Sequence, residues 1–201
     1  MTYATEVEIL NAEPVEIGPK RVVLHVGCGA PDPNKVPAAF FPADQWAELR
    51  LDIDPTVLPD IAASITDMSM IAEASVDGVW SAHNLEHLAS HEVPVALSEF
   101  HRVLKPAGFV LVTMPDLQQV AELIASGNLE DAAYMSAMGP IAPIDMLYGY
   151  RPALAQGNAF MGHRTGFTAL TLAQHLARAG FVDVRVQRDG RFALWASGVR
   201  A

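Results

Sequence analysis

Arg21–Ala30 constrains the possible fold of this chain more than any other segment. An apolar, β-branched run from Val22 to Val26 leads directly into Gly27 and Gly29. Such a run is typical of a buried strand, and the two glycines let the backbone turn tightly and approach a ligand. In open α/β sheets, nucleotide-like ligands bind at a turn of this kind, at the carboxyl end of the first parallel strand.

Length and composition favour a single globular domain over residues 1–201. The 201 residues are enough for a sizeable core, and 51% of them are hydrophobic. The chain has one cysteine, no signal peptide and no apolar run long enough to cross a bilayer, so we expect a cytoplasmic protein. The net charge of −10 disfavours nonspecific binding to nucleic acids or anionic membranes, which depends on clustered lysine and arginine.

Periodicity along the chain predicts strands that alternate with helices. After the first strand, further strands are expected over residues 48–53, 60–65, 75–82 and 109–114. Helices are expected over residues 93–104, 116–126 and 169–179, with a short one around residues 43–47. Residues 1–20 are expected to form an N-terminal arm or a short edge strand.

Two later features of the sequence refine this fold. Residues 115–165 contain several glycines and prolines and scattered aromatic residues, which indicates an insertion that acts as a lid or binding loop. The alternating runs at residues 182–186 and 192–196 are separated by a short turn centred on Asp189 and Gly190. Because so short a turn joins antiparallel strands, an otherwise parallel sheet would finish with one reversed strand.

Asp52 ends the second predicted strand and lies 23 residues beyond Gly29. This is close to the offset of roughly 20 residues at which an acidic group meets a ribose in dinucleotide-binding folds. A carboxylate there can accept hydrogen bonds from both ribose hydroxyls. The alternative is that Asp52 and Asp54 merely end a strand.

Five different short motifs follow one another along the chain in a specific order and spacing. They are Leu24–Gly29, Leu51–Asp54, Leu85–His87, Phe100–Gly108 and Met114–Leu117. Over roughly residues 21–198, the chain thereby resembles the class I S-adenosylmethionine-dependent methyltransferases, most of all a compact bacterial group. The resemblance implies a Rossmann-like α/β fold, with a doubly wound, mixed seven-stranded sheet that is mostly parallel and has an antiparallel last strand.

The resemblance also implies a binding site for S-adenosylmethionine, which leaves as S-adenosylhomocysteine. On the methionine side, the chain at Gly27, Cys28 and Gly29 would run past the cofactor. His83, at the tip of the fourth predicted strand, would lie near the same end.

On the nucleoside side, the family pattern implies four contacts. Asp52 would bind the ribose hydroxyls, and Ile53 would pack on the adenine ring. Asp67 would accept a hydrogen bond from the adenine amino group, with the backbone of Met68 next to it.

Three positions depart from the family pattern. The family has an acidic residue where this chain has His25, a third glycine where it has Pro31, and a glycine where it has Ala107. The first two departures motivate a second hypothesis, a noncatalytic or regulatory domain on the same fold with a degraded cofactor site.

Catalysis of methyl transfer depends mainly on holding the methyl group in line with a nucleophile. A general base is needed only when the acceptor must lose a proton. His87, His163 and Arg164 are the candidate catalytic residues. The alternative role of His87 is packing or a place in the cofactor loop. The alternative role of His163 and Arg164 is to anchor the lid.

The segment His83–His87 also matches H-x-x-E-H, the signature of the inverted zinc peptidases. In those enzymes two histidines one helical turn apart bind zinc, and the glutamate activates water. A zinc hydrolase that uses His83, Glu86 and His87, with His91 as a further ligand, is therefore a third hypothesis. Because the motif follows a predicted strand instead of lying on a long helix, no metal site is expected.

Together these features predict methyl transfer from S-adenosylmethionine to a small-molecule or glycan acceptor. The insertion at residues 115–165 would select the acceptor. No nucleic acid or membrane partner is expected, because the charge is strongly negative.

Overall fold

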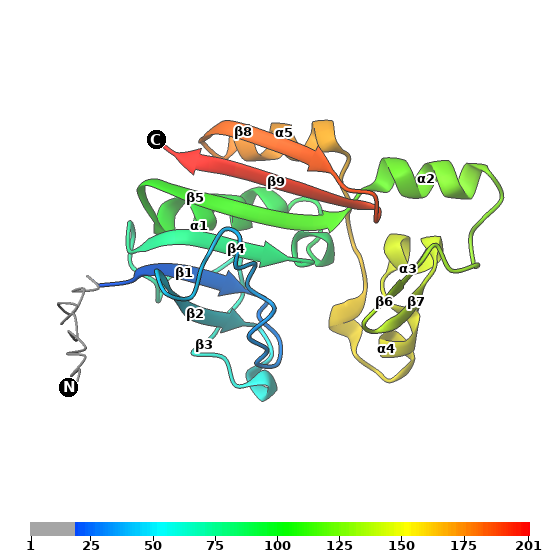
Figure 1. Ribbon diagram of the computed structural model, residues 1–201, viewed down its shortest axis with the longest axis horizontal. Helices are drawn as coiled ribbons and strands as arrows, with labels where there is room; N and C mark the ends of the chain where they lie inside the picture. Colours follow the sequence, from blue (N-terminus) through cyan, green and yellow to red (C-terminus); the bar gives the residue numbers. More distant parts are fainter. Residues whose placement is uncertain (1–18) are drawn as a thin grey trace, which may run out of the picture.

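A seven-stranded sheet forms the centre of the computed structural model, which describes residues 19–201 (Figure 1). The strand order is β3-β2-β1-β4-β5-β9-β8. The strands are β1 Arg21–Val26, β2 Trp46–Asp52, β3 Ile61–Ala62, β4 Val76–Ala82, β5 Leu104–Pro115, β8 Phe181–Arg188 and β9 Ala193–Arg200. β1 to β5 are mutually parallel, whereas β9 runs antiparallel to both β5 and β8. The predicted mixed sheet with its reversed last strand is confirmed. The arm or edge strand expected within residues 1–18 lies outside the described residues.

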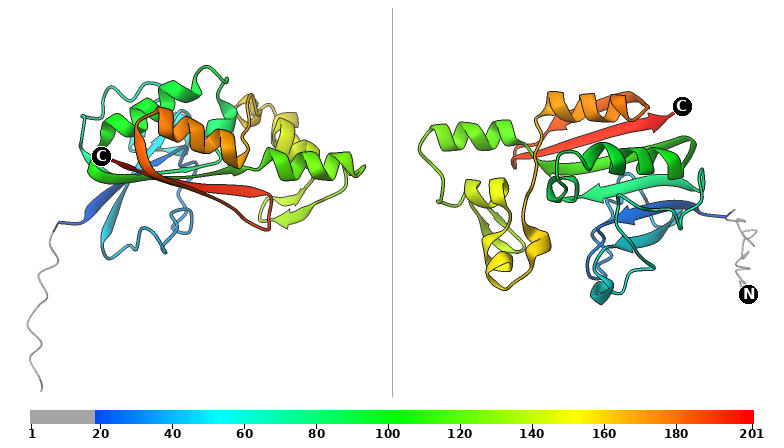
Figure 2. Two further views of the ribbon diagram at one scale, coloured as in Figure 1. Left: turned by 90° about the horizontal axis from the view of Figure 1, so that it is seen from above. Right: turned by 180° about the vertical axis from the view of Figure 1, so that it is seen from behind.

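Helices α1 (Val93–Val103) and α5 (Ala169–Arg178) cover one face of the sheet (Figure 2). The buried positions of α1 recur at helical spacing, so one side of the helix is apolar, and Pro94 sits in the first turn where it is tolerated. Thr168 caps α5 as predicted, because its side-chain oxygen accepts a hydrogen bond from the Thr171 amide at 3.3 Å. The main apolar core lies between these helices and the sheet.

Within residues 19–201, a loop and not a helix covers the opposite face of the sheet. Phe41 and Trp46 are 3% and 5% exposed and pack with Trp80 in a second apolar cluster. The ring of Phe41 stacks on Phe109 with 5.2 Å between centroids, and it meets Trp46 edge-on at 5.0 Å. The short helix predicted around residues 43–47 is wrong: residues 43–45 form turns, and Trp46 begins β2 because its indole is buried against the sheet.

The end of α1 leads into β5 earlier than expected. β5 begins at Leu104 and contains an irregularity that shifts its register with β4 between Val76 and Gly78. Within this irregularity Ala107 has a φ of +62°, the left-handed region that favours glycine. The alanine thus keeps the backbone conformation for which the family pattern has a glycine, at a cost of about 1–2 kcal/mol.

The insertion forms a small layer of its own beyond the carboxyl ends of β1, β4 and β5 (Figures 1 and 2). It contains α2 Leu117–Ala125, the hairpin β6 Tyr134–Ser136 and β7 Gly139–Ile141, α3 Pro143–Tyr148 and α4 Arg151–Ala155. Val120, Ile141 and Met146 are the buried centre of its apolar cluster. The chain then returns to the sheet through residues 158–165. No helix among residues 19–201 is long and apolar enough to cross a membrane.

We expect Phe41→Ala to lower the free energy of unfolding by about 3–5 kcal/mol, because the substitution removes a buried ring that covers a face without a helix. The neighbouring Phe40 is 48% exposed and serves as the matched control. Phe40→Ala should change the free energy by less than about 0.5 kcal/mol. Urea denaturation of the two variants would measure the difference, and equal effects would contradict the packing described here.

Candidate active site

A cavity of about 430 Å³ lies at the carboxyl ends of the parallel strands. On the sheet side its wall includes Gly27, Gly29 and Asp52. On the opposite side it is closed by residues 158–162 and Arg164, which belong to the returning end of the insertion. The cavity therefore joins the glycine turn to the segment expected to act as a lid.

The turn after β1 depends on glycine at its first position. Gly27 has a φ of +59°, and a Cβ atom there would lie only 1.8 Å from Oδ1 of Asn84. Nδ2 of Asn84 in turn donates a 2.6 Å hydrogen bond to the carbonyl of Val26. Asn84 therefore packs directly on the turn and fixes the end of β1.

Two basic side chains that the sequence interpretation missed hold the carbonyl oxygens of this turn. Nζ of Lys35 donates to the carbonyls of Cys28 at 3.0 Å and Ala30 at 2.8 Å. Nη2 of Arg50 donates to the carbonyl of Gly29 at 2.5 Å. No helix begins at Pro31, so these contacts fix the loop where the family pattern expects a third glycine.

His25 is accommodated by a partner on the next strand. Its side chain is buried, and Nδ1 forms a 2.6 Å hydrogen bond with Oε1 of Glu48 on β2. Burial lowers the pKa of His25, although the hydrogen bond and the charge of Glu48 oppose that shift. A carboxylate is thus present beside β1, but it comes from β2.

Asp52 joins the tips of β1 and β2. Its Oδ2 accepts the Gly29 amide at 2.7 Å, and its Oδ1 accepts the Asp54 amide at 2.9 Å. Asp52 is 9% exposed and lines the cavity, as does Ile53, whose side chain is 52% exposed. A carboxylate has about four lone-pair sites, so two remain for hydroxyl groups in the cavity.

Three of the predicted cofactor residues lie outside the cavity wall. Cys28 is buried, and its burial raises the pKa of the thiol. The Met68 side chain is fully buried, and its amide donates to Oε2 of Glu99 at 2.8 Å. Asp67 accepts a hydrogen bond from the Ser69 amide at 3.2 Å, whereas its neighbour Thr66 does line the cavity.

His83 lines the cavity at the tip of β4. Its φ of +53° is unusual for a residue other than glycine, and its amide donates to the carbonyl of Thr113 at 2.9 Å. Nδ1 of His83 hydrogen bonds to Oε1 of Glu86 at 3.1 Å. Partial burial acts to lower the pKa of His83, but the hydrogen bond and charge of Glu86 outweigh it and raise the pKa.

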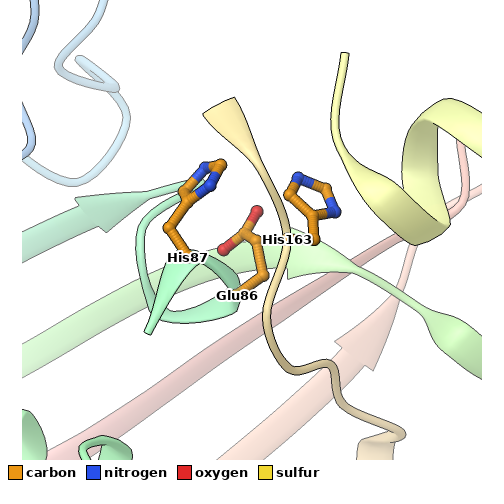
Figure 3. A group of neighbouring side chains, drawn as sticks. All are labelled: Glu86, His87 and His163. Atoms are coloured by element: carbon orange, nitrogen blue, oxygen red, sulfur yellow. The ribbon is translucent and has the colours of Figure 1, made fainter. Parts of the chain in front are cut away.

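Glu86, His87 and His163 lie together beside the cavity (Figure 3). The carboxylate of Glu86 points between the two imidazole rings, whose centroids are 4.9 Å apart. Burial acts to raise the pKa of Glu86, but the hydrogen bond from His83 and the electrostatic interactions with the three nearby histidines lower it. Burial lowers the pKa of His163 and thereby favours its neutral form, although the charge of Glu86 opposes the shift.

Backbone hydrogen bonds fix the return of the insertion at this point. The amides of Arg164 and Thr165 both donate to the carbonyl of Glu86, at 2.8 and 3.1 Å. Arg164 lines the cavity, and its Nη1 lies 3.5 Å from Oε2 of Glu92. Of the three catalytic candidates, His87 and Arg164 therefore reach the cavity wall, and His163 lies behind it.

The helix required by the zinc peptidase signature does not form. Leu85–His87 is a single turn of 3₁₀-helix, so His83 and His87 do not lie one α-helical turn apart on a long helix. The group that the fold brings together is Glu86, His87 and His163. Sequence spacing could not indicate His163, which is 76 residues away from His87.

Comparison with known proteins gives a match over the sheet residues that line this cavity. Residues 24–112 match the family model described as a methyltransferase domain. Over these residues the chain is similar to a methyltransferase domain. This agrees with the family suggested by the sequence motifs. No curated protein sequence matches the chain.

Solved structures share the fold at low sequence identity. A S-adenosylmethionine-dependent methyltransferase from Methanosarcina mazei has 14% identity and a TM-score of 0.58, over 90% of this chain and 92% of that chain. The 1,6-didemethyltoxoflavin-N1-methyltransferase of Burkholderia thailandensis has 16% identity and a TM-score of 0.53, over 90% and 72%. Human N-acetylserotonin methyltransferase has 15% identity and a TM-score of 0.56, over 90% and 47%. The chain thus spans less than half of the human chain.

The cavity fits S-adenosylmethionine, the cofactor that the similarity to methyltransferases implies. Gly27 and Gly29 line the cavity without a side chain, so a ligand can approach the backbone of the turn closely. Asp52 offers a carboxylate, and Ile53 offers an exposed apolar side chain next to it. The departures at His25 and Pro31 leave the turn ordered, since Glu48, Lys35 and Arg50 satisfy the groups around them.

We expect Gly27→Ala to lower the free energy of unfolding by at least about 2 kcal/mol, since the methyl group meets Asn84 and the backbone is left-handed. Gly190→Ala is the control, because Gly190 has open space at its Cβ position. That variant should stay within about 0.5 kcal/mol of the wild type. Thermal and urea unfolding of both variants would measure this, and a stable Gly27→Ala variant would contradict the contact with Asn84.

Proposed function

We propose that the protein transfers the methyl group of S-adenosylmethionine to a small-molecule or glycan acceptor within the cavity. The observation that carries the proposal is the continuity of this cavity, which reaches from Gly27 and Asp52 to residues 158–164 of the insertion. One space is thereby bounded by a donor side on the sheet and an acceptor side on the insertion. The bound cofactor supplies an electrophilic methyl group, and the protein supplies orientation.

The donor side of the proposal rests on the residues at the ends of β1, β2 and β4. The backbone of Gly27, Cys28 and Gly29 holds the methionine portion of the cofactor, with His83 beside it. Asp52 binds the ribose hydroxyls with the lone pairs that its two backbone hydrogen bonds leave free. Ile53 packs on the adenine ring.

The adenine amino group is the contact for which the family pattern names Asp67 and Met68. The Met68 amide already donates to Glu99, and Asp67 does not line the cavity. The assignment of the adenine amino group to these two residues therefore rests on the family pattern alone. Thr66 lies on the cavity wall next to them and offers a hydroxyl in their place.

The acceptor side is formed by the returning end of the insertion. Phe160 is 61% exposed and lines the cavity together with Asn158, Met161 and Arg164. An exposed aromatic ring suits a planar ring system or the apolar face of a sugar, and amide and guanidinium groups can donate to its hydroxyl or carboxylate oxygens. The net charge of −10 favours such acceptors over a nucleic acid.

If the acceptor must lose a proton, hydrogen bonding decides which ring nitrogen of His87 and His163 can accept it. Nδ1 of His87 donates to the carbonyl of Gly162 at 3.1 Å, and Nδ1 of His163 donates to the carbonyl of Met146 at 2.9 Å. A carbonyl oxygen can only accept, so each Nδ1 is assigned a proton, and in the neutral imidazole Nε2 is the atom with a free lone pair. For an acceptor that attacks without first losing a proton, orientation by Arg164 and Phe160 suffices.

Isothermal titration calorimetry with S-adenosylmethionine and S-adenosylhomocysteine tests the donor side. We expect the wild type to bind both ligands, and Asp52→Ala to bind them about 10- to 100-fold more weakly, because hydrogen bonds to a charged group are worth about 1.5–3 kcal/mol. Absence of binding to the wild type at millimolar ligand would contradict the proposed function.

Two further aspartate variants control this titration. Asp44→Ala removes an exposed carboxylate that does not line the cavity and should leave both affinities unchanged. Asp67→Ala separates the family pattern from the cavity geometry: a loss as large as that of Asp52→Ala would assign the adenine contact to Asp67. Equal binding by the wild type and Asp52→Ala would refute the ribose assignment alone.

A further inference from the structure

Glu86 carries a buried polar atom without a partner. The residue is 1% exposed, and Oε1 is hydrogen bonded to His83, but Oε2 has no hydrogen-bond partner among the described residues. An unsatisfied buried carboxylate oxygen costs roughly 1–3 kcal/mol or more, so such an atom calls for an explanation. Figure 3 shows this carboxylate aimed between His87 and His163.

The two histidines are arranged as metal ligands are. One ring nitrogen of each is fixed by a backbone carbonyl, that of Gly162 for His87 and that of Met146 for His163. Histidines that ligate metals usually donate their other ring N–H to a carbonyl or carboxylate, which orients the ring and fixes the tautomer. In each ring, Nε2 is the nitrogen that these two hydrogen bonds leave free.

We propose that Glu86, His87 and His163 form a binding site for a divalent transition-metal ion, with zinc as the best match. Ligand atoms from the three side chains lie within 4.8 Å of one another. Zinc bonds of about 2.0–2.2 Å place ligand atoms roughly 3.3–3.5 Å apart in a tetrahedron, so the side chains close by up to about 1.5 Å on binding. Two imidazoles and one carboxylate are a common protein ligand set for zinc and for ferrous iron.

The proposed site would join two distant parts of the chain. Glu86 and His87 follow β4, whereas His163 lies at the returning end of the insertion, which is already hydrogen bonded to the Glu86 carbonyl through Arg164 and Thr165. A metal ion there would hold the insertion against the sheet and leave its fourth coordination position open. While the ion is bound, Nε2 of His87 and His163 is unavailable as a base.

The site differs from the one that the H-x-x-E-H signature would give. His83 contributes a hydrogen bond to the Glu86 carboxylate instead of a bond to the metal, and His91 is exposed and outside the group. The inference does not depend on the proposed methyl acceptor, since it rests on the protein's own side chains.

Zinc titration of the full chain tests the proposal. The protein, purified without a histidine tag and dialysed against a chelator, is titrated with Zn²⁺ by calorimetry, and its Tm is measured with and without the ion. We expect one ion per chain at micromolar affinity or tighter and a higher Tm with zinc. No zinc binding at tens of micromolar would overturn the proposal.

Matched variants decide which side chains bind the ion. His163→Asn can keep a donor toward the Met146 carbonyl while it removes Nε2, and Glu86→Gln keeps the shape of the side chain. Each should weaken zinc binding about 100-fold or more, whereas His91→Ala should bind like the wild type. If His163→Asn fails to fold, Glu86→Gln alone carries the test. Unchanged zinc affinity in a folded variant of Glu86 or His163 would overturn the assignment. The affinity for S-adenosylhomocysteine, measured on the same samples, tests the proposed function separately.

Discussion

The hydrogen bonds from the amides of Gly29 and Asp54 to the carboxylate of Asp52 hold the site together. The bond from Gly29 ties the turn after β1 to the tip of β2, and the bond from Asp54 orients the carboxylate where β2 ends. Hydrogen bonds to a charged acceptor are shorter and roughly twice as strong as neutral ones. Because Asp52 retains free lone pairs that face the cavity, the interaction that orders the turn also leaves the same carboxylate ready for a ligand.

The turn is ordered here without the helix that a doubly wound sheet would place after it. In its place, Phe41 and Trp46 bury their rings against the sheet, and Lys35 and Arg50 donate to the carbonyls of the turn. Burial of large aromatic side chains contributes a few kcal/mol each, enough for an irregular segment to cover a sheet face. At Pro31, where the family pattern has a glycine, these side-chain contacts therefore hold the loop in place of a helix.

Sequence patterns predicted the elements whose periodicity is strong. The buried run before Gly27, the apolar stripe of α1 and the short turn at Asp189 gave the parallel sheet and its reversed strand. The patterns failed where tertiary contacts decide: Trp46 is drawn into β2 by the aromatic cluster, and His163 meets Glu86 only because the insertion returns to the carboxyl end of β4. The spacing of Asp52 predicted its place at the cavity because one strand-crossover-strand unit fixes that distance.

The central claim is that the glycine turn and the returning end of the insertion enclose one ligand. Hydrogen–deuterium exchange with and without S-adenosylhomocysteine tests it most directly, because it reports on both walls in a single experiment. The account predicts slower exchange of residues 27–30, 52–54 and 158–164 when the ligand is saturating. Slower exchange near Gly27 and Asp52 alone would contradict a shared cavity, and unchanged exchange in all three segments would contradict the site itself.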